Sequence, residues 1–345
     1  MIIYISCFIL LSLCSIIKKR KFNNVLFLLG CILLCFFACF RDASVGIDHA
    51  GYIDSSLGKT VRFGDKERIE IVWTWMNSVF KWIDIGPLFT IITSLLTLVP
   101  IFRLISKESE NKGLSLLLFL LIPYGYCFFL TGIRQSLAAA IVVWAFYYLT
   151  QKRYILTAIL SIIACGIHAS AILVFPFFAV CFINIKKYIL IILLIASALV
   201  GFLNRYSFFD FLGDITQYVE ILSMYEGYAS YHEDDELNLF GLISVIVPST
   251  VFGIVSVMYN NKDELYNKLY CCGVIGTNVF ASVPMIGRYF MYFTILQIIL
   301  VPDSYRRSPL LIRMGLLLTL VYMVLYFYIF IPEATETLDY KFFFS

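Results

Sequence analysis

The chain has 345 residues, of which 61% are hydrophobic and only 14% are charged, and its mean hydropathy is +0.88. Because an average soluble domain has about 25% charged residues, this composition excludes a soluble globular protein and indicates a polytopic membrane protein. The formal net charge of +3 is too small to indicate a nucleic-acid partner. The ten cysteines and three histidines lack metal-ligand spacing, so we expect neither a metal nor a cofactor.

Apolar segments that can cross a bilayer follow one another along the chain. A hydrocarbon core about 30 Å thick requires roughly 20 apolar residues per helix, and somewhat fewer when flanking groups snorkel. The candidate spans are residues 1–17, 25–40, 86–105, 114–131, 135–150, 155–167, 169–185, 188–204, 238–259, 268–285, 288–301 and 310–331. We therefore expect an all-α protein of about twelve transmembrane helices, in one integral membrane domain that covers residues 1–345. The first segment lacks the features of a signal peptide and is predicted to be a retained span.

Lysine and arginine are concentrated in alternate loops, which predicts the orientation. When the basic turn at residues 18–21 is placed in the cytoplasm, strict alternation places the other basic loops there too. These loops are residues 103–112, 152–153, 186–187, 262–268 and 306–313. Together with the first turn they hold most of the 26 basic residues. Both termini are then predicted to lie outside.

The orientation depends on how residues 155–184 fold. The alternative to two spans is one helix of about 45 Å, which is much longer than the hydrocarbon core. Gly166 and Pro176 also interrupt this stretch. We therefore predict two short helices that turn at His168.

Two long segments are predicted to lie outside the membrane. The first, residues 41–85, ends in an amphipathic helix over residues 70–84. Its polar stripe is Glu70, Thr74, Asn77, Lys81 and Asp84, and its apolar face is Val72, Trp75, Met76, Val79 and Ile83. With Trp73, Trp75 and Trp82 at the headgroup level, this helix is predicted to lie on the outer surface. The second segment, residues 204–237, is acidic and rich in tyrosine, which is typical of a sugar-binding surface or of an interfacial aromatic belt.

On this topology several ionisable residues share the outer membrane face. They are Arg41, Asp48, His49, Glu70, Arg134, His168 and Arg288. Arg134 and Arg288 lie near the first residues of the predicted helices 135–150 and 288–301. Helix N-termini favour anions, and guanidinium is a bidentate partner of phosphate, so these positions suit an anionic ligand. The alternative for each arginine is snorkelling to a lipid headgroup.

The same set contains four candidate proton acceptors, His168, Asp48, His49 and Glu70. A histidine side chain can accept or donate a proton near neutral pH. The alternatives are a His168 satisfied by a backbone partner, solvated loop side chains at Asp48 and His49, and a Glu70 that only stabilises a helix dipole.

Short motifs occur in a characteristic order over almost the whole chain. They are Arg41 with Val45-Gly46-Ile47-Asp48 and Tyr52, then Glu70, Gly132-Ile133-Arg134-Gln135-Ser136-Leu137-Ala138, Ile167-His168-Ala169-Ser170-Ala171, Arg288-Tyr289-Phe290 and Tyr340-Lys341-Phe342. This ordered set resembles the EpsG-type, Wzy-like family of bacterial exopolysaccharide and O-antigen polymerases. The chain departs from the pattern at Ile47, where Thr or Asn is common, and has His49 beside Asp48.

The resemblance implies a metal-independent glycosyltransferase of the multi-spanning GT-C type in the bacterial cytoplasmic membrane, with its reaction centre at the outer face. Its donor would be a glycan on undecaprenyl pyrophosphate and its acceptor a lipid-linked repeat unit, with a chain-length regulator protein as a candidate partner. The expected catalytic residues are Asp48, Glu70, His168 and Arg134. The expected substrate-binding residues are Arg41, His49, Tyr52, Arg134, Gln135, Arg288 and Tyr289.

Other functions remain as alternatives. A lipid-linked oligosaccharide flippase should have ionisable residues at mid-span and an internal repeat between its halves, and the sequence shows neither. A membrane O-acyltransferase needs an acyl donor from the cytoplasm, whereas His168 is predicted to lie outside. A structural partner in a secretion complex is compatible with the same patterns.

Overall fold

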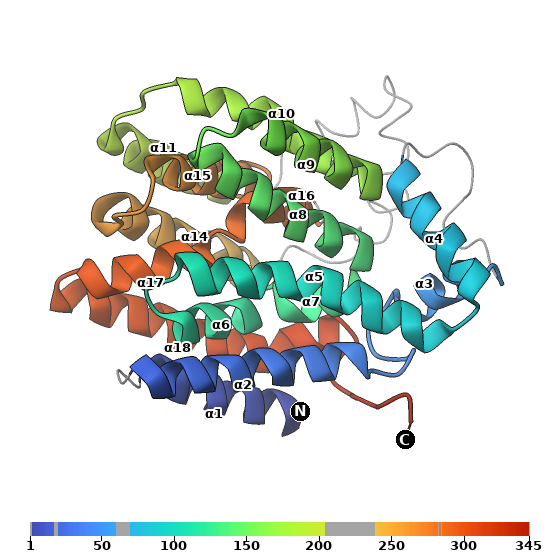
Figure 1. The fold of residues 1–345 in the computed structure, drawn as a ribbon. Coiled ribbons are helices and arrows are strands. Elements are labelled where there is room, and N and C mark those ends of the chain that lie inside the picture. Colours follow the sequence, from blue (N-terminus) through green and yellow to red (C-terminus); the bar gives the residue numbers. More distant parts are fainter. Residues whose placement is uncertain are drawn as a thin grey trace.

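The computed structural model describes residues 2–16, 20–59, 70–203, 239–281, 283 and 285–344, and it is helical throughout these residues except for loops and one isolated bridge between Arg41 and Phe342. The long helices run side by side as a bundle (Figure 1). The elements are α1 (Ile2–Ile16), α2 (Arg20–Cys39), α3 (His49–Ser56), α4 (Ile71–Ile83), α5 (Gly86–Glu108), α6 (Lys112–Leu121), α7 (Tyr126–Thr131), α8 (Ile133–Thr150), α9 (Tyr154–Ile167), η1 (Ala169–Leu173), α10 (Val174–Phe177), η2 (Phe178–Phe182), α11 (Lys187–Leu203), α14 (Leu239–Tyr259), α15 (Glu264–Val279), α16 (Ile286–Thr294), α17 (Gln297–Arg307) and α18 (Leu310–Ala334). The predicted Tyr-rich segment 204–237 lies outside the described residues.

Within the described residues, five helices are long and apolar enough to cross a membrane. These stretches are Lys21–Cys39, Gly86–Glu108, Ile133–Thr150, Gly241–Tyr259 and Leu310–Glu333. Shorter apolar helices cover Ile3–Ile16, Lys112–Leu121, Tyr154–Ile167, Ala169–Val180 and Lys187–Leu203. The prediction of an all-α, polytopic membrane protein is confirmed, while several of the twelve predicted spans are short or interrupted helices.

Two predicted spans are broken near their middle. The segment 114–131 forms α6 and α7, separated at Ile122–Gly125. Pro123 has no N–H and its ring collides with a preceding carbonyl in a continuous helix, so the ladder stops there. The segment 288–301 is divided between α16 and α17 by Ile295 and Leu296, which keep helical backbone angles but form a tighter turn with hydrogen bonds between residues three apart. The break at Ile122–Gly125 places irregular backbone inside the bundle, which membrane proteins tolerate where protein surrounds it.

The predicted turn at His168 is confirmed. Helix α9 ends at Ile167, and His168 has extended backbone angles (φ −148°, ψ 120°). The stretch after it differs from the single helix that was predicted over residues 169–185, because it consists of η1, α10 and η2. These are short turns of mixed 3₁₀ and α geometry around Pro176, where the helical ladder lacks a donor.

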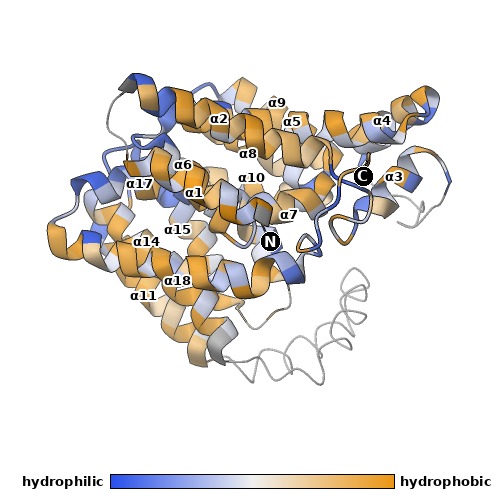
Figure 2. Ribbon diagram, turned by 90° about the horizontal axis from the view of Figure 1, so that it is seen from below, coloured by the Kyte–Doolittle hydropathy of each residue, from blue (hydrophilic) through white to orange (hydrophobic). Residues whose placement is uncertain are grey.

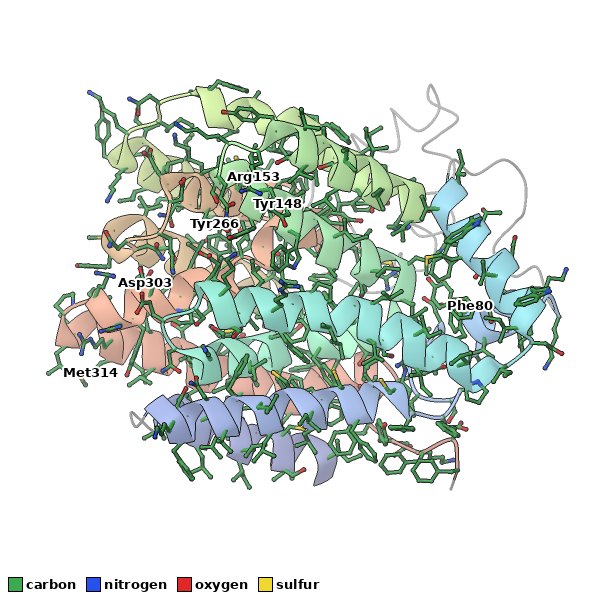
Figure 3. The ribbon with its side chains drawn as sticks, viewed as in Figure 1. Phe80, Tyr148, Arg153, Tyr266, Asp303 and Met314 are labelled. Carbon is green, nitrogen blue, oxygen red and sulfur yellow. The ribbon has the colours of Figure 1, made fainter. Side chains whose placement is uncertain are left out.

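The two ends of the bundle differ in chemistry. At one end, which we call the basic end, Arg306 contacts Glu110 at 2.5 Å, Arg307 contacts Asp303 at 2.9 Å, and Lys262 lies 4.0 Å from Glu108. Helices α3 and α4 cover the opposite end, which we call the site end (Figure 1). Figure 3 places Asp303 at the basic end and Phe80 at the site end. The predicted basic loops 103–112, 262–268 and 306–313 therefore do lie at one end of the molecule.

Helix α4 is the predicted amphipathic helix, and one of its three tryptophans is buried instead of exposed. Trp73 and Phe80 are buried against the bundle, and their rings pack edge-on to Phe89. Trp75 and Trp82 are 67% and 86% exposed. Trp73 was predicted at the headgroup level but is buried, because its ring packs against Phe89 of α5. The exposed Trp75 and Trp82 form the apolar stripe expected of a helix that lies at a membrane surface. Figure 2 shows α3 and α4 at one end of the apolar bundle.

The last residues of the chain close over the connection between α2 and α3. The backbone N–H of Asp42 donates to Lys341 (2.9 Å), that of Gly46 donates to Glu336 (3.0 Å), and that of Phe343 donates to Phe40 (3.2 Å). The Tyr340 hydroxyl donates to the Phe37 carbonyl. The C-terminal segment therefore fixes the loop that leads into α3.

Candidate functional site

The site is built around a buried ion pair between α8 and the residue before α4. Arg134 is the second residue of α8, directly after Gly132 and Ile133, and it is 7% exposed. Its Nη1 donates to Oε2 of Glu70 at 2.5 Å, and Glu70 is 3% exposed. A charge-assisted bond of this length in the interior fixes both side chains. The pair joins segments that lie 64 residues apart.

The second carboxylate oxygen of Glu70 holds the turn after α9. Oε1 accepts hydrogen bonds from Nδ1 of His168 at 3.0 Å and from the backbone N–H of Ala169 at 3.1 Å. Burial raises the pKa of the Glu70 carboxyl, but the bonds from His168 and Ala169 and the charge of Arg134 outweigh burial and lower that pKa to about 2. Glu70 is therefore ionised at neutral pH, and both of its oxygens are occupied.

His168 presents its other ring nitrogen to the site. The side chain is 23% exposed, and among the described residues Nε2 has no hydrogen-bond partner. An ionised carboxylate can only accept hydrogen bonds, so the His168 Nδ1 is assigned as the donor to Glu70. In the neutral ring, Nε2 is then a hydrogen-bond acceptor. This arrangement, a carboxylate that orients an imidazole whose far nitrogen is open, is the geometry of a general base.

Tyr52 completes the surroundings of Arg134. The Arg134 Nε lies 3.5 Å from the Tyr52 hydroxyl, and its Cζ lies 5.6 Å from the centre of the Tyr52 ring. The ring packs edge-on against Trp73 of α4. The predicted site residues Tyr52, Glu70, Arg134 and His168 are thus in one cluster.

Gln135 connects this cluster to α16. Its Nε2 donates to the Arg288 carbonyl at 2.5 Å and lies 3.4 Å from Oγ of Ser170. Ser170 and the Tyr292 hydroxyl are 2.8 Å apart. These contacts place the first turn of α16 beside the turn that carries His168. The sequence did not indicate Ser170 or Tyr292 as site residues, because each becomes part of the site only through contacts between distant segments.

Arg288 is the cation at this site that lacks an acidic partner among the described residues. Its Cζ lies 5.4 Å from the centre of the Phe128 ring, and the side chain is half-buried. It is the third residue of α16, where helix N–H groups favour an anion. The preceding Met285 has a positive φ of 57°, which is uncommon for a residue with a side chain and often accompanies functional sites.

Two of the predicted substrate-binding residues, Arg41 and His49, lie in the interior of the protein and not at the site. Arg41 is 2% exposed, and its guanidinium donates to the Ala38 carbonyl, to Ser94 at 2.9 Å and to the Leu130 carbonyl at 3.2 Å. Burial lowers the pKa of the Arg41 guanidinium to about 10. His49 is fully buried, with Nδ1 3.1 Å from the Asp42 carbonyl and Nε2 2.9 Å from Thr90. Both side chains join elements of the fold and do not face Arg134.

The remaining candidates are Asp48 and Tyr289. Asp48 precedes α3, is half-buried, and has no hydrogen-bond or ion-pair partner for its carboxylate among the described residues. It lies one helical turn before Tyr52. Tyr289 is half-buried and follows Arg288 in α16.

Within the described part of the chain, no group of three or more His, Cys, Asp or Glu side chains lies close enough to hold a metal ion. The chemistry that the site offers comes from an imidazole, a carboxylate and two guanidinium groups.

Neither the curated proteins nor the solved structures contain a significant match. A protein-family model described as the EpsG family matches residues 24–342, which is nearly the whole chain and includes every predicted site residue. The chain belongs to the EpsG family.

Proposed function

We propose that this protein is a polysaccharide polymerase that joins repeat units carried on undecaprenyl pyrophosphate, at the outer face of the bacterial cytoplasmic membrane. The observation that carries the proposal is the buried carboxylate of Glu70, which binds both Arg134 and His168. Membership of the EpsG family supports a role in polysaccharide synthesis. The GT-C class and the lipid carrier are parts of the proposal that rest on the resemblance.

In the proposed reaction, the hydroxyl oxygen of the acceptor sugar forms a bond to the anomeric carbon of the donor. The bond between that carbon and the pyrophosphate oxygen breaks, and the pyrophosphate keeps the electron pair. His168 Nε2 accepts the hydroxyl proton. Glu70 orients the imidazole and stabilises the positive charge that the ring gains.

The leaving group requires positive charge, because negative charge accumulates on the pyrophosphate in the transition state. Arg288 suits this role, since it lies at the first turn of α16 and has no acidic partner among the described residues. Arg134 supplies a second guanidinium, and its Nη1 already donates a hydrogen bond to Glu70. Arg41 is left out of this mechanism because its donors are bound to interior acceptors.

His168 is a better proton acceptor in this scheme than Glu70. The pKa of Glu70 is about 2, so the carboxylate binds a proton only weakly, and its two oxygens already accept three hydrogen bonds. Asp48 is the alternative base.

The proposal is tested by replacing Arg134 with Ala and with Lys in cells that lack their own polymerase. We expect long polymer to disappear in Arg134→Ala and to be strongly reduced in Arg134→Lys, because a single ammonium cannot reproduce the geometry of the guanidinium. Arg306→Ala, at the exposed ion pair of the basic end, is the matched control. Long polymer in both Arg134 variants at normal protein level contradicts the anion-binding role.

The purified protein gives the direct assay. With a lipid-pyrophosphate repeat unit as substrate, a polymerase produces a ladder of products on a gel. In a deletion strain, single repeats should accumulate. Accumulation of lipid-linked units on the inner leaflet would instead identify a flippase.

A further inference from the structure

A cavity of about 70 Å³ lies inside the bundle, next to the site. It is lined by the break between α6 and α7, one face of α14, Thr277 of α15, both ends of α16, the start of α17 and the middle of α18. A single water requires roughly 10–15 Å³ of such space, so the cavity accommodates a group several times larger than one water. The mechanism proposed above does not use it.

One end of the cavity lies at the first turn of α16, the turn that also carries Arg288. Gly287 lines the cavity and directly precedes Arg288 in α16. The Tyr124 ring, which also lines it, packs so closely that a Cβ at position 287 would lie 2.1 Å from the ring. From this point the lining extends along α16 to Thr294 and along α18 to Met323. The cavity therefore leads from the proposed anion-binding turn into the middle of the bundle.

The lining suits a hydrocarbon chain that has a charged end near Arg288. Most of its surface is apolar, with Leu121, Ile122, Val245 and Met323 among the lining residues. Met adapts its shape to irregular apolar ligands. On α14 and α18 the lining side chains Val245, Ser249, Tyr322 and Tyr326 are partly exposed, and the other side of α18 carries the highly exposed Leu318 and Leu325. The cavity thus borders the surface of the bundle that lipid covers.

We infer that this cavity binds the first isoprene unit of the lipid whose pyrophosphate lies at Arg288. The inference rests on the proposed function, since it assigns the tail of the proposed substrate to a particular recess. The occupant is an isoprenoid because the donor of the proposed reaction carries a polyprenyl chain on the pyrophosphate that lies at the first turn of α16. A phospholipid acyl chain is the competing occupant that the experiment distinguishes.

The test uses the purified full-length protein and two donors that carry the same sugar and pyrophosphate, one on a full-length polyprenyl chain and one on an ethyl group, which lacks an isoprene unit. Ser249→Phe fills the recess from α14, where the Ser249 hydroxyl bonds only carbonyls of its own helix. Ser249→Ala removes the hydroxyl without filling the recess. Gly315→Phe adds the same ring to α18, at a position where a Cβ meets nothing within 4 Å.

We expect Ser249→Phe to lower kcat/KM for the full-length donor by about tenfold or more, because each methylene kept out of the recess weakens binding severalfold. The loss should be carried by KM. The short donor should lose less, and Ser249→Ala and Gly315→Phe should behave like the unmodified protein. Should Ser249→Phe inactivate the protein with both donors, Ser249→Val repeats the comparison with a smaller side chain.

Equal losses of kcat/KM for the two donors in Ser249→Phe and Ser249→Val would overturn the inference. An unchanged kcat/KM for both donors would also overturn it, and this is the result expected if the cavity holds only phospholipid. Failure of the proposed function looks different, because the unmodified protein would then convert neither donor.

Discussion

At the scale of single residues, Glu70 has the largest effect on the site. Its carboxylate accepts hydrogen bonds from Arg134, His168 and Ala169. One buried side chain therefore connects α8 and the turn after α9 to the start of α4. Removing a partner from such a network leaves the others buried and unsatisfied, which is more costly than the loss of one bond. The sequence indicated Glu70, Arg134 and His168 separately, but their mutual contacts depend on segments up to 99 residues apart.

The lowered pKa of Glu70 makes stability depend on pH. The folded-state pKa is about 2, whereas the ordinary value is 4.5, so the unfolded state binds more protons as the pH falls. The stabilisation is fully present above about pH 4.5, is lost as the pH falls towards 2, and amounts to roughly 3 kcal/mol. We expect the thermal unfolding temperature of the wild type to fall more steeply between pH 5 and pH 3, roughly the window set by these pKa values, than that of Glu70→Gln. Parallel curves would contradict this assignment.

Whether His168 or Asp48 is the proton acceptor can be decided by substituting each residue. If His168 is the base, His168→Ala should lower kcat by about 10²-fold or more, while Asp48→Asn should have a much smaller effect. The measurement is turnover of the purified variants with the lipid-pyrophosphate repeat unit. The reverse order of effects would assign the base to Asp48.

At the scale of elements, the loop between α2 and α3 determines where α8 begins. Gly46 has φ +101°, and a Cβ there would lie 3.0 Å from the Leu130 carbonyl oxygen. The Arg41 guanidinium donates to that same carbonyl, and the Thr131 hydroxyl donates to the Thr335 carbonyl. The junction of α7 and α8 at Gly132 is therefore held by the N-terminal loop and by the C-terminal segment together.

Gly46→Ala should destabilise the protein, because the left-handed conformation costs a residue with a side chain about 1–2 kcal/mol and the added methyl group meets a backbone oxygen. We expect a lower thermal unfolding temperature and reduced polymer length. Gly241→Ala is the control, since a Cβ there meets nothing within 4 Å and alanine favours a helix. A Gly46→Ala variant as stable as this control would refute the role given to Gly46.

The apolar segments could be read from the sequence because a helix in a membrane needs a long apolar run whatever surrounds it. The breaks within 114–131 and 288–301 were not predicted, since hydropathy is continuous across them. Pro123 was visible in the sequence, but a proline inside a spanning helix is tolerated when neighbours satisfy the freed backbone groups. Only the surrounding helices decide between a kink and a break.

At the scale of the whole molecule, charge separates the two ends of the bundle. Ion pairs of Arg306, Arg307 and Lys262 lie at the basic end, while the Glu70 cluster lies at the site end. The positive-inside rule would place the basic end in the cytoplasm and the site outside. This orientation is part of the proposal and can be tested directly.

A cysteine introduced at exposed Ser78 of α4 should react with a membrane-impermeant maleimide in intact cells, because α4 is expected at the outer surface. A cysteine at Lys262, at the basic end, should react only after the cells are opened. Labelling is measured as the increase over the wild type, which has ten cysteines of its own. The opposite pattern would invert the topology and place the site in the cytoplasm.

The sequence by itself determined that this protein is helical and polytopic, that an amphipathic helix lies within residues 70–84, and that the chain turns at His168. Each of these properties depends on local composition and periodicity. Only the tertiary structure decided that Arg134 and His168 share one carboxylate while Arg41 and His49 are buried away from it. The physical reason is that an ionisable side chain takes its role from its partners, and here the partners come from distant helices whose packing no local pattern encodes.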